Sequence, residues 1–254
     1  MEKKKRNNTR KKRITFFKVF SILALIAGAI VFALVSPVFN IETITVKGNE
    51  KVDSDTIIGL SGIQLGSNIF RSVSSNIKDN IKENPYIENV KVERILPNSI
   101  EILVEERKVD YQIKIIDGYV GIDYQGYILE TFANDQKVLF IEGLETDQND
   151  LLNGTRVWKE DIEHLNVFSK IVNNAKSLDL YKLITKIIYK DNEYILYFQN
   201  AKKYAYLGNG TDVTNKMLYV KTILEKEEKN SGKIFVNGNL NEGFKPYFRE
   251  EKID

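Results

Sequence analysis

The stretch VFSILALIAGAIVFALVSPVF, residues 19–39, decides how the rest of this chain is organised. It is apolar apart from a few small or weakly polar residues and Pro37. A helix rises about 1.5 Å per residue and the hydrocarbon core of a bilayer is about 30 Å thick, so about 20 apolar residues cross it. We therefore expect residues 19–39 to form a single transmembrane helix that delivers residues 40–254 to one side of a membrane.

The residues before this stretch are strongly basic. Residues 1–18 carry nine Lys and Arg against one acid, Glu2. Because basic flanks stay in the cytoplasm, we expect a cytoplasmic tail at residues 1–18 and a C-terminus outside the cytoplasm. A cleaved secretory signal also has a basic start and an apolar middle, but its apolar part is about 7 to 15 residues long. The end of this run, Leu34-Val35-Ser36-Pro37, also fits a cleavage site poorly, which favours a retained anchor.

Composition excludes several classes of function. The whole chain has a net charge of +2 and residues 1–18 have +8, so the remainder carries −6. This argues against a nucleic-acid role for residues 40–254, because phosphate binding needs a concentrated basic surface. The chain has no cysteine, which rules out disulfides and thiolate metal sites. Its one histidine, His164, cannot form an imidazole pair for zinc. We expect no catalytic residue, no metal and no cofactor.

A small α+β domain is predicted directly after the span. Period-two alternation indicates a strand over residues 41–47, which ends in a turn at Gly48-Asn49. Asp53 or Ser54 is expected to cap a short helix that stops near Ser61-Gly62. A second helix is indicated by one apolar stripe, formed by Phe70, Val73, Ile77 and Ile81.

Two strands complete this domain. They are expected over residues 87–94 and 100–105, on either side of the turn Leu96-Pro97-Asn98-Ser99. The order is then strand, helix, helix, strand, strand. Two helices packed on one face of a three-stranded sheet would bury the apolar faces of both layers.

The segments NPYIENVKVER, residues 84–94, and LPNSIEILVEER, residues 96–107, resemble the second half of a POTRA domain. The version they resemble is that of the bacterial division protein family FtsQ, called DivIB in Gram-positive bacteria. That family also has an opening strand that ends in a Val-x-Gly-Asn turn soon after a single span, here Val46-Lys47-Gly48-Asn49. Family members often place a proline shortly after the Glu-Arg pair, where this chain has Lys108-Val109. The resemblance implies a POTRA domain over residues 40–108.

Residues 109–254 are expected to form a mixed, β-rich domain with flanking helices. A hairpin is predicted at residues 119–129, with a positive φ at Gly126. Helical stripes over residues 162–172 and 213–224 indicate two helices, and His164 is expected to be solvated because it lies off the first stripe. Period-two alternation between residues 187 and 206 indicates a meander of antiparallel strands.

This second domain is open to two catalytic or ligand-binding interpretations. Asp117, Asp123 and Glu130 could form the paired carboxylates of a glycosidase. Acids beside glycines are more often turn formers, which is the interpretation we favour. The tyrosines of the meander could stack on sugars or bases, but tyrosine is also simply favoured on half-buried sheets, and we prefer that explanation.

The last segment, Phe244-Lys245-Pro246-Tyr247-Phe248-Arg249, is aromatic and short. Pro246 cannot donate a ladder hydrogen bond, so a strand here must lie at a sheet edge. An exposed edge can be extended by a strand of another protein, a mode called β-augmentation. By the resemblance, this is where FtsB/DivIC-type partners with FtsL add, and the partner-binding residues would be Phe244, Tyr247 and Phe248. The equally weighted alternative is a terminal segment that only covers its own sheet.

Together these features predict an α+β, non-enzymatic, membrane-anchored interaction module. The resemblance implies a divisome scaffold at the division septum that links small single-span division proteins and septal peptidoglycan synthases. One alternative is a POTRA-type secretion or assembly chaperone with a transporter barrel, which would need many further strands of about ten residues each. A cell-wall enzyme is the third option, and the sequence has no Gly-x-Ser-x-Gly elbow, nucleotide loop or metal-spaced ligands for it.

Overall fold

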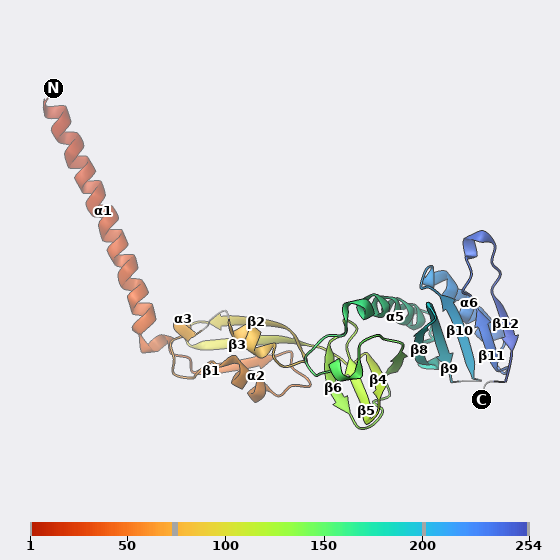
Figure 1. Cartoon of the computed structure of the whole chain (residues 1–254). Coiled ribbons are helices and arrows are strands. Elements are labelled where there is room, and N and C mark those ends of the chain that lie inside the picture. Colours follow the sequence, from red (N-terminus) through yellow and green to blue (C-terminus); the bar gives the residue numbers. More distant parts are fainter. Residues whose placement is uncertain (1, 73–75, 200–201, 253–254) are drawn as a thin grey trace. The chain divides into compact units, whose positions relative to one another are not determined.

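The computed structural model describes residues 2–72, 76–199 and 202–252, with side chains from residue 16 onward. The chain forms two compact units, Met1–Glu106 and Arg107–Asp254 (Figure 1). The fold is α+β, as predicted, with one N-terminal apolar helix, a POTRA-like unit and a β-rich unit. The finer division of the chain at residues 18, 39 and 108 stays a prediction.

The first helix, α1 (Glu2–Val35), contains one segment that is long and apolar enough to cross a membrane, Phe16–Val35. Its helical structure ends at Val35, before the end of the apolar run. The residue before a proline is disfavoured in the α region, and Ser36 accordingly has an extended backbone at ψ 130°. A short 3₁₀ turn, η1 (Pro37–Phe39), follows.

The rest of the first unit has the predicted order β-α-α-β-β, with one additional short helix. Its elements are β1 (Thr43–Lys47), α2 (Ser54–Ser61), α3 (Ile69–Ser72), α4 (Asn76–Ile81), β2 (Ile87–Ile95) and β3 (Ser99–Glu106). The sheet order is β1-β3-β2, in which β1 runs parallel to β3 and β2 runs antiparallel to it. Asp53 caps α2 by accepting a hydrogen bond from the Asp55 amide, and Gly62 ends the helix in the left-handed conformation.

The helices of this unit cover one face of its sheet with aliphatic side chains. Ile57 of α2, Ile81 of α4 and Ile102 of β3 are all 0% exposed. The predicted stripe is partly wrong, because Phe70 is exposed and the preceding residue, Ile69, is buried in its place. Val73 of that stripe lies outside the described residues. The chain forms α3 and α4 where one continuous helix was expected.

The second unit is one nine-stranded mixed sheet with two long helices. Its strand order is β12-β11-β10-β9-β8-β7-β4-β5-β6. The strands are β4 (Tyr111–Ile115), β5 (Gly118–Ile122), β6 (Ile128–Phe132), β7 (Leu139–Glu142), β8 (Ile184–Lys190), β9 (Glu193–Phe198), β10 (Lys203–Gly208), β11 (Gly232–Phe235) and β12 (Tyr247–Glu250). The helices are α5 (Lys159–Ser177) and α6 (Val213–Lys226). The predicted hairpin is confirmed as β5–β6, and the meander as β8–β9–β10.

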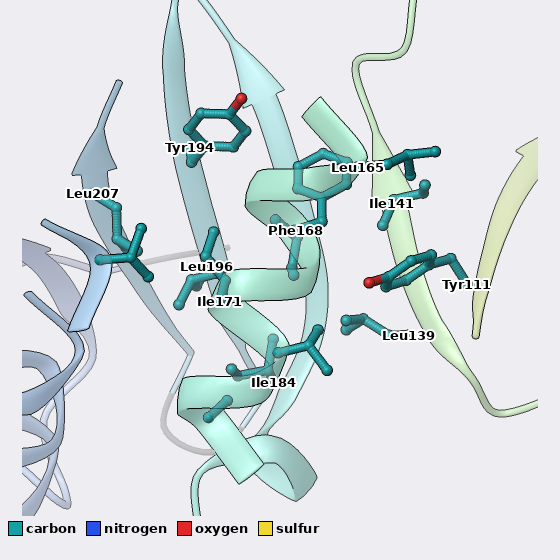
Figure 2. Close-up of a cluster of buried hydrophobic side chains, with 14 of the residues drawn as sticks. Tyr111, Leu139, Ile141, Leu165, Phe168, Ile171, Ile184, Tyr194, Leu196 and Leu207 are labelled. Carbon is teal, nitrogen blue, oxygen red and sulfur yellow. The ribbon is translucent and has the colours of Figure 1, made fainter. Parts of the chain in front are cut away.

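The core of this unit lies between the two long helices and one face of the sheet (Figure 2). Phe168 of α5 and Met217 of α6 are both 0% exposed. They belong to the same cluster as a row of sheet residues that are also 0% exposed, namely Ile187, Leu196, Ala205 and Ile234. These four are register partners across β8 to β11. Both helices therefore cover the same face of the sheet.

His164 is not a solvated helix residue, which corrects the prediction. Its ring lies 3.8 Å from the ring of Tyr189, centroid to centroid, and its Nδ1 lies 2.8 Å from the hydroxyl of Tyr194. The helical stripe placed His164 off the core face correctly, but β8 and β9 supply a second, aromatic surface at that position. Burial raises the pKa of Tyr194 to about 12, so its hydroxyl stays protonated at neutral pH.

Candidate partner-binding edge

The second half of the predicted partner-binding segment, residues 247–249, lies in β12, the terminal strand of the nine-stranded sheet. β12 pairs antiparallel with β11, and Phe235 lies opposite Tyr247 while Ile234 lies opposite Phe248. Among the described residues, no strand pairs with the other side of β12. The position expected from Pro246 is thus observed, because that residue directly precedes an edge strand.

Neighbouring strand residues point to opposite faces, so the three predicted residues do not form one surface. Phe248 packs against the core cluster from the helix-covered face. Tyr247 is on the other face and remains 42% exposed. Phe244, which precedes the strand, lies 6.4 Å from the Tyr247 ring. Tyr247 is therefore exposed on the outer face of the sheet next to Phe244, whereas Phe248 holds β12 onto its own sheet.

The outer face of the sheet carries a stack of three aromatic rings that ends at the free edge. The ring of Tyr206 on β10 lies 5.0 Å from that of Phe235 on β11, at an interplanar angle of 9°. The Phe235 ring lies 4.8 Å from that of Tyr247, at 18°. Buried and partly exposed side chains alternate along residues 204–206 and 233–235. This alternation does not show that Tyr206, Phe235 and Tyr247 share one row.

Charged side chains flank this aromatic row. The Arg249 guanidinium lies 5.1 Å above the Phe235 ring, in cation–π geometry. Lys233, opposite Arg249 in the register, forms an ion pair with Glu251 at 2.9 Å. The hydrogen bond to Glu251 raises the pKa of Lys233. The edge therefore presents aromatic surface with cationic side chains next to it.

Gly232 lets β12 approach β11 closely. A Cβ atom at this position would lie 2.2 Å from the backbone oxygen of Arg249 and 2.7 Å from the Phe248 ring. A side chain here would push β12 away from the sheet. The edge thus depends on a glycine in the neighbouring strand, which sequence reasoning did not identify.

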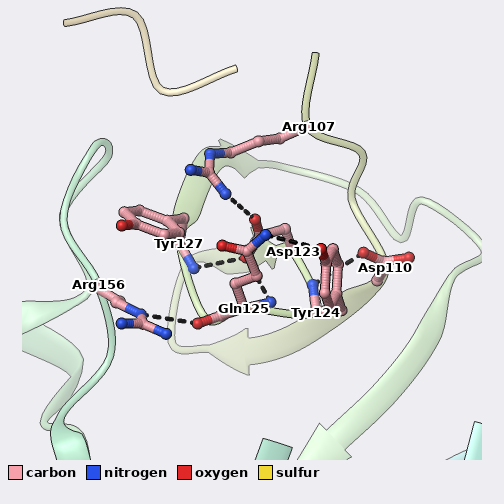
Figure 3. A network of polar contacts seen from close by, with 7 residues as sticks. All are labelled: Arg107, Asp110, Asp123, Tyr124, Gln125, Tyr127 and Arg156. Carbon is pink, nitrogen blue, oxygen red and sulfur yellow. Dashed lines mark hydrogen bonds and ion pairs between the residues drawn. The ribbon is translucent and has the colours of Figure 1, made fainter. Parts of the chain in front are cut away.

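Of the three acids of the catalytic alternative, Asp117 and Asp123 lie at opposite ends of β5, and Glu130 lies on β6 opposite Gly121. Asp123 is 1% exposed, forms an ion pair with Arg107 at 2.5 Å, and accepts backbone hydrogen bonds from Gln125 and Tyr127 at 2.9 and 2.8 Å (Figure 3). This is the turn-forming role that we favoured for it. Asp117 is exposed beside Gly118 at the turn between β4 and β5. In the part of the chain that the structure describes, no group of three His, Asp or Glu residues is placed to hold a metal ion.

Asp110 adjoins the same turn. Its carboxylate accepts a hydrogen bond from the Tyr124 amide at 2.9 Å (Figure 3). Burial raises the pKa of this carboxyl group, an effect that the hydrogen bond partly offsets. The guanidinium of Arg107 also lies 3.7 Å from the centroid of the Tyr127 ring. These contacts tie the start of the second unit to the β5–β6 hairpin.

Comparisons with known proteins agree with the architecture. Residues 39–107 match the family model described as "POTRA domain, FtsQ-type". The chain is 33% identical over 194 residues to cell division protein DivIB of Clostridium acetobutylicum, covering 71% of this chain and 72% of that protein. It is 29% identical to DivIB of Clostridium botulinum strain Loch Maree, covering 91% and 88%, and 27% identical to cell division protein FtsQ of Corynebacterium glutamicum, covering 85% and 92%.

Proposed function

This chain belongs to the DivIB/FtsQ family of bacterial cell division proteins, and from that premise we propose that it is a noncatalytic scaffold of the divisome. It binds small single-span division proteins of the FtsB/DivIC and FtsL types and thereby connects them to septal peptidoglycan synthases. The observation that carries this proposal is the free edge of β12, where the aromatic row of Tyr206, Phe235 and Tyr247 ends.

An added strand would bind this edge in two ways. Its backbone would pair with the unpaired side of β12, which supplies affinity that does not depend on sequence. Its side chains on the outer face would continue the aromatic row next to Tyr247, which supplies specificity. Aromatic cross-strand pairs contribute roughly 0.2 to 1 kcal/mol each, so the contact is modest by itself.

Membrane anchoring allows a weak contact at the edge strand to hold a partner. The apolar segment Phe16–Val35 fits a single-pass anchor, and the basic residues before it favour an orientation with the N-terminus in the cytoplasm. We place the protein in the cell membrane at the division septum, with residues 40–254 outside the cytoplasm. Partners confined to the same membrane meet at a high effective concentration, so weak edge pairing can hold them.

The first experiment compares capture of the partners by three forms of the tagged full-length chain in detergent. The variant Tyr247→Ala removes the exposed end of the aromatic row. Tyr219→Ala is the matched control, because Tyr219 is 45% exposed on α6 and Tyr247 is 42% exposed on β12. We expect co-purification of FtsL-type and DivIC-type proteins to fall in Tyr247→Ala and to stay at the level of the unmodified chain in Tyr219→Ala.

A chain that ends at Asn241 tests the whole edge, because it lacks β12. Removal of β12 uncovers Ile234 and Phe235 on β11, so circular dichroism must first show that this shorter chain is folded. Loss of partners from a folded truncation supports both the scaffold and the site. Equal capture by all forms would move the site to another surface, and capture by none would contradict the scaffold role.

A further inference from the structure

Five exposed apolar side chains gather at one end of the POTRA unit, and we call them the apolar collar. In the described part of residues 36–106, the large apolar side chains that remain exposed are Val38, Leu65, Phe70, Ile95 and Leu96. Single exposed hydrophobic residues are ordinary, but a contiguous set marks an interaction surface. Whether these five side chains form an interaction surface therefore depends on whether they lie close together.

Backbone hydrogen bonds show that the collar residues lie at the same end of the sheet. The amide of Ile41, just before β1, donates to Ser67 at 2.9 Å, and the amide of Gly66 donates back to Ile41 at 2.8 Å. The amide of Glu42 donates to Asn98 at 2.8 Å. The loop that holds Leu65 and the β2–β3 turn that holds Leu96 thus both flank the start of β1.

This end also contacts the last turn of α1. The Asn68 side chain donates to the carbonyl of Ala33 at 2.9 Å. The Phe39 ring lies 6.3 Å from that of Phe32 on α1 and 5.3 Å from that of Phe70 on α3. Val38 follows the apolar segment Phe16–Val35 by three residues. Groups that touch the end of a membrane-spanning helix must lie within the headgroup layer, which adds only about 5 to 8 Å on each side of the hydrocarbon core.

Two arginines accompany the collar. Arg71 is exposed in α3, and Arg94 of β2 donates from Nε to the carbonyl of Ile69 at 3.1 Å. Arginine side chains lay their stems along apolar surface and keep the guanidinium among polar groups. Apolar side chains with neighbouring cations match the interface of a phospholipid leaflet, where acyl chains and phosphates occur together.

From this arrangement we propose that the apolar collar rests on the membrane surface, so that the POTRA unit is held against the phospholipid leaflet next to its own span. The occupant of the collar is lipid, since contact with the end of α1 places these side chains at the bilayer. The inference rests on the proposed membrane anchor. It adds that the first extracytoplasmic unit is seated on the membrane and does not swing freely on the span.

The test uses the full chain, one molecule per nanodisc of phosphatidylethanolamine and phosphatidylglycerol. The chain has no cysteine, so single cysteines can be labelled cleanly with an environment-sensitive fluorophore. Leu65→Cys and Leu96→Cys report on the collar. Glu50→Cys is the control, because Glu50 is exposed just beyond the opposite end of β1. Leu25→Cys, within α1, reports separately on whether the anchor is inserted.

We expect lipids with a headgroup nitroxide to quench most of the fluorescence at residues 65 and 96 and little at residue 50. Lipids with a nitroxide deep in the acyl chain should quench the label at residue 25. Suppose that the label at residue 25 is quenched but the labels at residues 65 and 96 are quenched no more than the label at residue 50. That result would overturn the membrane contact of the collar and leave the anchor intact. Absence of deep quenching at residue 25 would overturn the anchor and, with it, the collar.

A second variant separates real lipid contact from closeness imposed by the tether. Leu65→Cys is combined with Phe70→Asp and Leu96→Asp, which place two charges among the four other collar residues. We expect headgroup quenching at residue 65 to be largely lost. Unchanged quenching in this variant would show that the tether alone brings residue 65 to the membrane and would refute the proposal.

Discussion

Replacing Asp123 with asparagine tests the buried ion pair at the start of the second unit. Asparagine keeps an oxygen that can accept from the amides of Gln125 and Tyr127, so the turn between β5 and β6 should survive. The lost feature is the negative charge opposite Arg107, whose side chain is only 9% exposed.

The expected loss of unfolding free energy follows from these contacts. Removing one partner of a buried ion pair costs about 3 to 5 kcal/mol, because the other charge is left buried and unpaired. The Arg107 guanidinium keeps its contact with the Tyr127 ring at 3.7 Å, which favours the lower end of that range. We expect Asp123→Asn to lower the free energy of unfolding by about 3 kcal/mol. Asp123→Ala should cost about 5 kcal/mol, because two amides also lose their acceptor.

Urea unfolding of the full chain in mild detergent measures both effects. Trp158, the single tryptophan, lies in the second unit, and its amide donates to Thr146, so its fluorescence reports on this fold. With a slope of about 2 kcal/mol per molar urea, Asp123→Asn should lower the midpoint by about 1.5 M. A loss below about 1 kcal/mol for Asp123→Asn would contradict the ion pair. Equal losses for Asn and Ala would contradict the contribution of the two amide hydrogen bonds.

Two further predictions concern the core of the second unit. Burial raises the pKa of Tyr194 to about 12, so above pH 10 the native state holds a proton that the unfolded chain releases, and stability falls as the pH rises to 12. Between pH 9 and pH 12 the unmodified chain should therefore lose about 2 kcal/mol of unfolding free energy relative to Tyr194→Phe. A difference between the two chains that does not change with pH would argue against a buried neutral phenol. Phe168→Ala should cost about 3 to 5 kcal/mol through the cavity it leaves, measured by urea unfolding. The exposed Lys170→Ala on the same helix should change stability by less than about 0.5 kcal/mol, and a similar effect of both would refute the core assignment.

The local sequence pattern was sufficient to predict most helices and strands of the POTRA unit. Asp53 and Gly62 mark the ends of α2 through their own side chain and backbone, so neighbouring residues determine that helix. The strand β3 alternates between buried and less buried residues because one face of its sheet is covered. Phe70 was misplaced because two short helices, α3 and α4, stand where the apolar spacing predicted one.

Contacts between distant residues could not be inferred in this way. His164 meets Tyr194 across 30 positions of sequence, and nothing in the stripe of α5 indicates which strand will lie beside it. The split of the predicted edge residues was foreseeable, since Tyr247 and Phe248 are adjacent and a strand must turn them to opposite faces. The resemblance and the proline identified the segment, but not which of its aromatic residues stays exposed.

By itself the sequence determined the apolar span, the order of strands and helices in the POTRA unit apart from one short helix, the family and the edge position of the last strand. These features depend on composition, period and residue type within short windows. Only the tertiary structure decided that β1 pairs with β3 in parallel, that β4 to β12 form one continuous sheet, and that Tyr206, Phe235 and Tyr247 stack in one row. The pairing of strands far apart in sequence depends on how whole helices and sheets bury their apolar faces together, and no local pattern contains that information.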